Sequence, residues 1–315
     1  MKFWKTIASE IENGHNLVLL YVIESSGSSP GRQGFKMAVS NSGLLAGSIG
    51  GGIMEHKLVE LCKSELLKAK FDPFIKKQIH QSDIPANKSG MICSGEQTIA
   101  FFHLGKAQLS LVQKIIHANN SNNRQLVLSN SGIQIIEATN AFKLQIEINN
   151  SLHWQLKEQL NFLPVLHIIG GGHVSLALSK FAQETGFDVV VYDDRSRLNT
   201  MEENSFAKTI YIEDYSTINN IIPNGARTYV VIMSFGFKTD KIILKSLLKG
   251  KYKYLGMMGS RAKIDILFRE LLEEGVNNNK LEKVFAPIGL PIASKTPQEI
   301  AVSILGQIVL QKNQS

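Results

Sequence analysis

A glycine-rich turn in the C-terminal half is the feature of the sequence best suited to binding chemistry. Gly170, Gly171 and Gly172 lie between an apolar run typical of a strand and a helical pattern. Gly170 and Gly172 match a G-x-G-x-x-G turn, in which the free amide groups of a helix N-terminus bind the phosphates of a dinucleotide. Ser175 stands at the third glycine position, and a tightly packed turn without a ligand is the alternative.

Two acidic residues follow the next predicted strand. Asp193 and Asp194 come after the run 188–192, roughly 20 residues beyond Gly170, where an acid commonly binds ribose hydroxyls. The agreement of strand, turn, helix and acid favours a phosphate-bearing ligand over packing alone. His173 opens the predicted helix, and its side chain could cap or pack instead of binding a ligand.

A second candidate turn, at 256–263, joins another predicted strand to another predicted helix. Ser260, Arg261 and Lys263, with Gly259 before them, could bind an oxyanion together with the free amides of that helix. A helix cap with an exposed arginine accounts for the same residues equally well. From the residues alone, both interpretations stay open.

Two loops in the N-terminal half also carry backbone donors. Gly27, Ser28 and Ser29 belong to the first loop, and the second is the glycine-rich stretch 47–52, followed by Glu55. Amide groups in such loops could bind an anion. Glycines also form hairpin turns, and the residues alone favour that interpretation.

Cys93 lies in a loop before a predicted strand, whereas Cys62 falls within an amphipathic helical pattern. A thiolate in a loop can ligate a soft metal, although most lone cysteines are small buried hydrophobic residues. The two cysteines form no C-x-x-C pair, and the eight histidines show no H-x-H or H-E-x-x-H spacing. This pattern excludes a zinc ribbon and a disulfide framework, and it favours a reducing compartment.

These candidates lie on two predicted domains. In the C-terminal half, apolar runs alternate with helical patterns, which indicates a parallel sheet with helices on both faces. The N-terminal half combines helical patterns with a hairpin and period-two alternation typical of an antiparallel sheet. We therefore predict an α/β fold in which a smaller mixed α+β domain at 1–150 precedes a Rossmann-like domain at 164–315. A linker with a short helix is expected at 151–163.

Composition sets the class of protein. The chain has 315 residues, of which 43% are hydrophobic and 19% charged, enough for two cores. Its net charge of +7 does not come from clustered lysines, so we expect a solvated surface that favours small anions, and no nucleic-acid interface. The longest apolar runs are too short to span a membrane, and residues 1–13 do not resemble a signal peptide, so we expect a cytoplasmic protein.

Taken together, these segments resemble the XdhC/CoxI family, the maturation factors of xanthine dehydrogenase and related molybdenum hydroxylases. The resemblance is carried by the stretches 27–32, 47–55, 93–95, 170–174, 192–195, 256–263, 286–290 and 295–300. Two departures stand out. Where the family usually has a Thr-His pair before its acid, this chain has Ser234 and Phe235, so only Asp240 carries over. The family's Cys-Gly-Gly is Cys-Ser-Gly here, which keeps the thiol of Cys93.

The resemblance implies a chaperone for the molybdenum cofactor (molybdopterin). Such a protein binds the cofactor, shields it while a cysteine desulfurase supplies the terminal sulfido ligand, and delivers it to apo xanthine dehydrogenase or a related hydroxylase. A homodimer is implied in the same way. Cys93 is the candidate molybdenum ligand. The candidate cofactor-binding residues are Gly27, Ser28, Ser29, Gly50, Gly51, Gly52, Glu55, Gly170, Gly171, Gly172, His173, Asp193, Asp194, Asp240, Gly259, Ser260, Arg261 and Lys263.

Two other functions fit parts of the sequence. An NAD(P)-dependent oxidoreductase could use Gly170, Gly172 and Asp193 for the nucleotide, but His173 and Asp240 are its only candidate proton donors or acceptors. A pure scaffold could bind the hydroxylase and the desulfurase without holding any cofactor. We expect a non-catalytic maturation factor.

Overall fold

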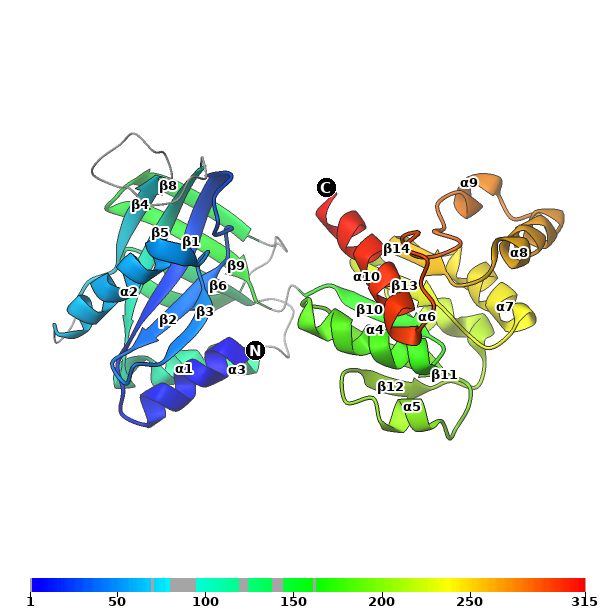
Figure 1. Cartoon of the computed structure of the whole chain (residues 1–315), viewed down its shortest axis with the longest axis horizontal. Coiled ribbons are helices and arrows are strands. Elements are labelled where there is room, and N and C mark those ends of the chain that lie inside the picture. Colours follow the sequence, from blue (N-terminus) through cyan, green and yellow to red (C-terminus); the bar gives the residue numbers. More distant parts are fainter. Residues whose placement is uncertain are drawn as a thin grey trace. The chain divides into compact units, whose positions relative to one another are not determined.

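The computed structural model describes residues 2–68, 71–79, 95–118, 124–137, 144–160 and 163–314. The chain forms two compact units, Met1–Phe162 and Leu163–Ser315 (Figure 1). The predicted α/β fold, with a Rossmann-like parallel sheet in the C-terminal unit and antiparallel sheets in the N-terminal unit, is confirmed. The N-terminal unit is not the smaller of the two. Within the described residues, no helix combines the length and apolarity that a bilayer span requires.

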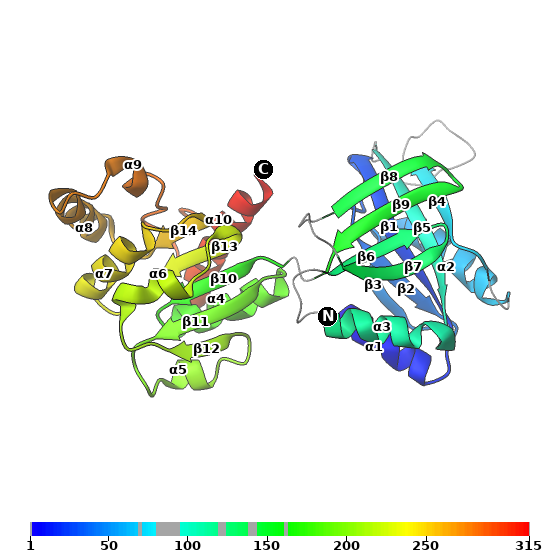
Figure 2. The same ribbon diagram turned by 180° about the vertical axis from the view of Figure 1, so that it is seen from behind.

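The N-terminal unit contains two antiparallel sheets, with strand orders β3-β2-β1-β5-β4 and β7-β6-β9-β8. Figure 2 shows the second sheet from its outer side. The strands of the first sheet are β1 (Leu17–Gly27), β2 (Lys36–Ser40), β3 (Leu45–Ser48), β4 (Phe74–Ile79) and β5 (Gly95–Leu104). Those of the second are β6 (Arg124–Ser129), β7 (Gly132–Glu137), β8 (Leu144–Asn150) and β9 (His153–Gln159). The helices are α1 (Lys2–Glu12), α2 (Gly52–Leu66), the short η1 (Lys106–Gln108) and α3 (Leu109–His117).

Strand β1 lies at the centre of this unit, and its residues 17–23 are fully buried. Leu19 and Tyr21 pack with α1, α3 and the second sheet, whereas Leu20 packs against α2 on the opposite face. Because both faces of β1 are covered, its sequence is a continuous apolar run and does not alternate.

The expected linker at 151–163 is wrong for most of its length. Residues 153–159 form β9, which pairs with β6 and β8, and the boundary between the units falls after residue 162. Trp154 and Leu156 point into the core of the N-terminal unit, and Glu158 accepts a hydrogen bond from the buried Tyr21 hydroxyl. The period-two burial in this segment is that of a strand with one covered face.

The C-terminal unit is built on a five-stranded parallel sheet in the order β12-β11-β10-β13-β14. Its strands are β10 (Val165–Ile169), β11 (Asp188–Asp193), β12 (Lys208–Tyr211), β13 (Gly225–Ile232) and β14 (Tyr252–Met257). Its helices are α4 (His173–Glu184), α5 (Asn199–Glu202), η3 (Tyr215–Thr217), α6 (Ile218–Ile221), α7 (Phe237–Leu247), α8 (Arg261–Glu273), α9 (Asn278–Leu281) and α10 (Pro297–Asn313).

Helices cover both faces of this sheet. Leu178 of α4 and Ile304 of α10 pack on one face, and Leu244 of α7 and Leu267 of α8 pack on the other. The chain builds β10, β11 and β12 in one direction and then returns to add β13 and β14 on the opposite side. The strand order therefore reverses between β10 and β13, and ligands of open α/β sheets usually bind beside the carboxyl ends of the two strands at such a reversal.

Candidate functional site

Gly170 makes the close turn at the end of β10. Its φ is +114°, and a Cβ built on it would lie 2.3 Å from the carbonyl oxygen of Met233. That oxygen belongs to the backbone that follows β13, so it cannot rotate away as a side chain could. The predicted role of Gly170 in permitting a tight turn agrees with this geometry.

Both backbone polar groups of Gly171 are hydrogen-bonded within the protein. Its N–H donates to Oδ2 of Asp193 at 2.6 Å, and its carbonyl oxygen accepts from the hydroxyl of Thr200. A Cβ at this position would lie 2.6 Å from Met201, whose side chain covers the turn. This amide therefore holds the turn in place and is not offered to a ligand.

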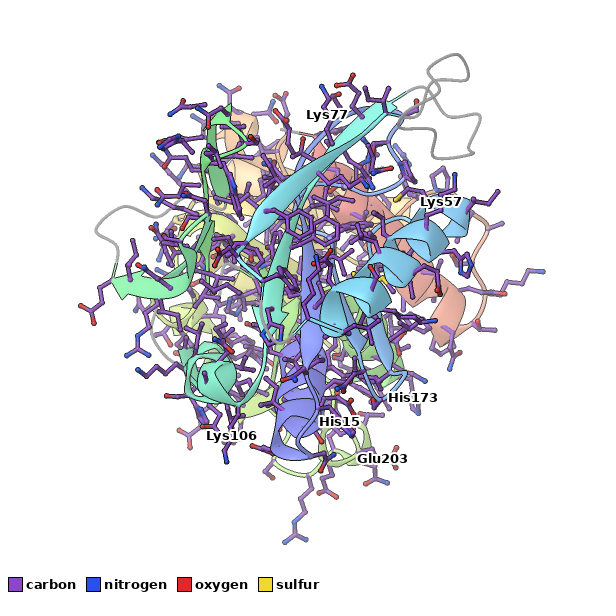
Figure 3. The ribbon with its side chains drawn as sticks, turned by 90° about the vertical axis from the view of Figure 1, so that its left-hand side faces the viewer. His15, Lys57, Lys77, Lys106, His173 and Glu203 are labelled. Carbon is purple, nitrogen blue, oxygen red and sulfur yellow. The ribbon has the colours of Figure 1, made fainter. Side chains whose placement is uncertain are left out.

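Gly172 is the open position of the turn. It is the N-cap of α4, with φ −72° and ψ −174°, and no described side chain caps the helix there. A Cβ at Gly172 would meet no described atom within 4 Å. The first amides of the 12-residue helix α4 thus lack a side-chain acceptor and face an accessible surface. His173, the first helical residue, is exposed (Figure 3).

Asp193 supports the turn from beneath. It is 1% exposed, and both of its carboxylate oxygens are 2.7 Å from guanidinium nitrogens of Arg195. Burial raises the pKa of Asp193, but the hydrogen bonds from Arg195 and Gly171 outweigh burial and hold the pKa below its ordinary value. Because both oxygens are engaged, the predicted ribose contact would require Asp193 to give up partners. Its exposed neighbour Asp194 is more accessible to a ligand.

A second buried carboxylate organises the turns after β13 and β14. Asp240 is fully buried, and its Oδ1 accepts from the Ser234 hydroxyl at 2.5 Å. Its Oδ2 lies 2.5 Å from Nζ of Lys263. A Cβ at Gly259 would lie 3.2 Å from the Lys263 side chain, which is a tight contact. The absence of a side chain at Gly259 therefore gives the Lys263 side chain room to reach Asp240. Asp240 thus fixes the amine of Lys263, a residue whose side chain remains 27% exposed at the carboxyl edge of the sheet.

The remaining predicted residues of the second turn start helix α8. The Ser260 hydroxyl accepts from the N–H of Lys263 at 3.3 Å, as an N-cap does. Arg261 is exposed. The two interpretations of this turn are thus compatible, because Ser260 caps the helix while Arg261 and Lys263 keep their charges near the sheet edge.

The three turns of the C-terminal unit share one edge of the sheet. A Cβ on Gly170 would lie 2.9 Å from the amide nitrogen of Ser234, and Lys263 reaches Asp240. The N–H of Met258 donates to the carbonyl of Ile232 at 2.8 Å, which joins the ends of β14 and β13. We call the surface formed by 170–172, 234–236 and 259–263 the edge crevice.

In the N-terminal unit, the glycine-rich loop already holds an anion of its own. Oε2 of Glu55 accepts from the hydroxyl of Ser48 at 2.7 Å, from the N–H of Ile49 at 2.9 Å and from the N–H of Gly51 at 3.0 Å. Burial raises the pKa of Glu55, yet these hydrogen bonds lower it further than burial raises it. A phosphate could use these two amides only by displacing the carboxylate.

Several glycines of this unit serve close packing. A Cβ on Gly50 would lie 2.7 Å from the amide nitrogen of Gly31, and a Cβ on Gly95 would lie 2.4 Å from that of Ser29. The buried Gln97 links the loops, because its Oε1 accepts from the Ser29 hydroxyl at 2.9 Å and from the N–H of Gly31 at 3.2 Å. Sequence reasoning missed Gln97, which lies in an ordinary strand pattern.

The remaining N-terminal candidates have few described partners. Gly27 and Gly52 have φ values of +61° and +70°, which favour glycine. Cys93 lies outside the described residues. Cys62 is buried, and burial raises the pKa of its thiol to about 12, so it is not a reactive thiolate. The described residues contain no group of three or more His, Cys, Asp or Glu side chains that could hold a metal ion.

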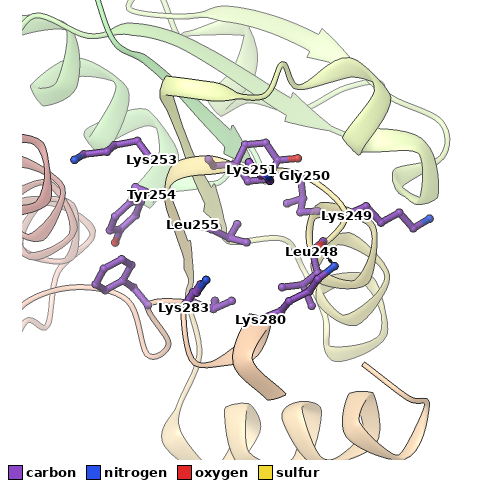
Figure 4. A pocket seen from close by; sticks show the side chains of 13 residues that line it. Leu248, Lys249, Gly250, Lys251, Lys253, Tyr254, Leu255, Lys280 and Lys283 are labelled. Carbon is purple, nitrogen blue, oxygen red and sulfur yellow. Dashed lines mark hydrogen bonds between the residues drawn. The ribbon is translucent and has the colours of Figure 1, made fainter. Parts of the chain in front are cut away.

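A lysine-rich cavity lies along the first half of β14, away from the edge crevice (Figure 4). Its volume is about 500 Å³, and none of the 13 described residues that line it is acidic. Lys280 donates to the carbonyl of Leu248 at 2.9 Å, and Lys253 donates to that of Gln314 at 3.3 Å. Lysines beside an edge strand also prevent it from pairing with other chains. The cavity fits the predicted solvated surface as well as it fits an anion site.

The architecture and the edge crevice define a class of two-unit proteins with a C-terminal Rossmann domain. Residues 166–308 match the model described as the XdhC Rossmann domain, and residues 10–71 match the model of the XdhC and CoxI family. The chain belongs to the XdhC and CoxI family.

Two curated relatives were found by sequence. The chain is 24% identical over 314 residues to the uncharacterized protein YqeB of Escherichia coli K12. This alignment covers 99% of this chain and 47% of that protein. It is 27% identical over 151 residues to a probable xanthine dehydrogenase subunit of Bacillus subtilis 168, covering 46% of this chain and 42% of that protein. The chain thus spans about half the length of the curated relatives it matches.

A solved structure shares the fold over nearly the whole chain. The crystal structure of a protein described as a xanthine dehydrogenase from Bacillus halodurans aligns with a TM-score of 0.73, covering 99% of this chain and 96% of that one. The sequence identity is 21%. At this identity the likeness shows the fold alone.

Proposed function

We propose that this protein is an accessory factor of xanthine dehydrogenase, or of a related molybdenum hydroxylase, that holds the molybdenum cofactor in its edge crevice. Membership of the XdhC and CoxI family supports the accessory role. The cofactor is cargo in this proposal: it is held during sulfuration by a cysteine desulfurase and then passed to the apo-hydroxylase.

The observation that carries the proposal is the open N-terminus of α4 at Gly172, on the same sheet edge as two cationic side chains. Amides at a helix N-terminus that lack a side-chain acceptor are suited to binding a phosphate. Arg261 and Lys263 supply positive charge on the neighbouring turn, and Asp240 holds Lys263 in place. A pterin cofactor that bears a phosphate matches this donor set.

The structure changes the roles that we assign to the acidic residues. Asp193 and Asp240 are positioning residues, because the carboxylate of each is hydrogen-bonded and ion-paired to other residues of this protein. Glu55 fills the N-terminal loop. We therefore propose the C-terminal unit for the phosphate. That Cys93 ligates molybdenum stays a separate prediction, because this residue lies outside the described residues.

The oxidoreductase alternative receives less support from the same geometry. NAD(P) would need an acid for its ribose; the oxygens of Asp193 are occupied, which leaves only the exposed Asp194 of the predicted pair for this contact. A hydride-transfer enzyme also needs an accessible proton donor or acceptor. Asp240 is fully buried between Ser234 and Lys263, and His173 is an exposed helix-start residue.

The test is retention of cofactor by the purified protein. The protein is mixed anaerobically with molybdenum cofactor released from a hydroxylase, and molybdenum and pterin are measured after gel filtration, with NAD in a parallel run. We expect stoichiometric pterin with the wild type, strongly reduced pterin with Arg261→Gln, and unchanged pterin with the control Arg269→Gln, which removes an exposed arginine from the same helix. Cys93→Ala should retain less molybdenum.

Other outcomes would change the proposal. Retention of NAD without pterin would support the oxidoreductase. A Cys93→Ala, Arg261→Gln double variant that still matures the hydroxylase fully would support a scaffold that holds no cofactor. Gel filtration of the same samples reports whether the chain forms the proposed homodimer.

A further inference from the structure

Phe235 is the most exposed aromatic residue in the described part of the chain. It is 88% exposed, compared with 52% for Tyr211 and 44% for Phe35. Contact with water is unfavourable for an aromatic ring, and rings left outside a core are frequent binding contacts. Phe235 directly follows Ser234 in the edge crevice, so its exposure coincides with the candidate site.

The turn that carries Phe235 is held on both sides. Before it, the Ser234 hydroxyl donates to Oδ1 of the buried Asp240 at 2.5 Å. After it, Gly236 has a φ of +126° and its carbonyl accepts from the N–H of Asp240 at 3.1 Å. The ring therefore projects from a fixed backbone, which lowers the entropy lost when a ligand packs against it.

The position of the ring relates it to the phosphate donors. Phe235 follows β13, the strand between β10, which leads to Gly172, and β14, which leads to Lys263. The amide of Ser234 lies close to Gly170, and Lys263 shares Asp240 with Ser234. An exposed aromatic residue and two kinds of phosphate donor thus follow three adjacent strands at the switch point of the sheet.

We propose that Phe235 stacks on a planar fused heteroaromatic ring, so that the edge crevice selects ligands in which such a ring is joined to a phosphate. This inference rests on the proposed function and deepens it, because it assigns the ring and the phosphate of the ligand to different residues. The pterin of the molybdenum cofactor has this chemistry, and so does the adenine of a dinucleotide. Stacking on an aromatic face does not by itself distinguish the two rings.

The experiment separates ring binding from phosphate binding in the full-length protein. Dissociation constants are measured for molybdenum cofactor and NAD by quenching of ligand fluorescence or by equilibrium dialysis, and for inorganic pyrophosphate as a ligand without a ring. The variants are Phe235→Ala and the conservative Phe235→Trp. Circular dichroism confirms that both fold, as the exposure of the residue leads us to expect.

We expect Phe235→Ala to weaken binding of the preferred ring ligand roughly 5- to 100-fold. Phe235→Trp should stay within about threefold of the wild type, and pyrophosphate should bind all three proteins equally. The relative affinities of the wild type for molybdenum cofactor and NAD identify the ring. An equal fall for ring ligand and pyrophosphate would overturn the inference, because it would indicate damage to the turn.

Three further outcomes decide between this inference and the function on which it rests. If the wild type binds molybdenum cofactor and Phe235→Ala binds it equally well, the inference fails while the proposed function stands. If Phe235→Ala also changes the elution volume on gel filtration, the inference fails because the ring belongs to a contact between copies of the chain. If the wild type binds no ring ligand, both proposals fail.

Discussion

Gly172→Ala should abolish ligand retention while leaving the fold intact. The wild-type φ of −72° and ψ of −174° suit any residue, and the added Cβ would meet no described atom within 4 Å. Alanine lowers the conformational entropy of the unfolded chain relative to glycine, which stabilises the folded state of such a variant by about 0.4–1 kcal/mol. Alanine is a poorer N-cap than glycine by a similar amount, so the net change should stay within about 1 kcal/mol.

The effect of the same methyl group on a bound phosphate is much larger. It would occupy the space through which an anion approaches the first amides of α4. Each hydrogen bond to a charged group contributes roughly 1.5–3 kcal/mol. Loss of one such bond weakens binding by about 10- to 150-fold, which gel filtration would record as complete loss of a micromolar ligand.

Gly170→Ala is the matched contrast. Here φ is +114°, and the new Cβ would lie 2.3 Å from a backbone oxygen of Met233, so we expect the C-terminal unit to lose at least about 2–4 kcal/mol. Both tryptophans of the chain, Trp4 and Trp154, belong to the N-terminal unit. Urea unfolding followed by tryptophan fluorescence therefore reports the unfolding of that unit, and circular dichroism also reports the unfolding of the C-terminal unit.

Wild-type ligand binding by a folded Gly172→Ala protein would refute the assignment of the phosphate to α4.

Three further variants test ionisable groups that are fully or partly buried. Burial lowers the pKa of His167, which stacks on Tyr192, to about 4, so the unfolded chain takes up a proton between about pH 6.5 and 4 that the folded unit excludes. The stability of the wild type relative to His167→Phe should therefore fall by about 3 kcal/mol as the pH drops through that window, measured by urea unfolding; parallel pH curves would contradict this. Glu55→Ala should vacate the N-terminal loop and let millimolar inorganic phosphate raise the unfolding midpoint seen by tryptophan fluorescence, whereas phosphate should have no such effect on the wild type. Asp240→Asn should release Lys263 and cost about 1–3 kcal/mol of stability together with at least tenfold in pyrophosphate affinity, and an unchanged affinity would remove Asp240 from the positioning role.

The elements that sequence predicted well are those whose signals are local. The start of α10 shows what a local signal is: the Thr296 hydroxyl accepts from the N–H of Glu299 at 3.2 Å, and Glu299 accepts from the N–H of Thr296 at 2.9 Å, as a capping box requires. The alternation of apolar runs and helical patterns likewise predicted the parallel sheet, because strands covered on both faces must be apolar throughout.

The predictions that failed concern residues whose partners are distant or unexpected. Segment 153–159 looks like part of a linker in the sequence because the neighbours of Trp154 and Leu156 lie on β1, α1 and α3, far away in the chain. No local pattern indicates that Glu55 folds back onto the loop before its helix. A motif supplies the positions of donors, but which acceptor they meet depends on the packed structure.

The occupied donors show where a ligand has room. Twice this protein satisfies the amides of a glycine turn with its own carboxylate: Asp193 accepts from Gly171, and Glu55 accepts from Ile49 and Gly51. A phosphate at either place would have to replace charged hydrogen bonds, each contributing roughly 1.5–3 kcal/mol, and would leave a carboxylate beside an anion. At Gly172 no described side chain takes that place. Two sets of glycine-turn amides are therefore structural, and the amides that follow Gly172 are the position at which we propose that an external phosphate binds without competition.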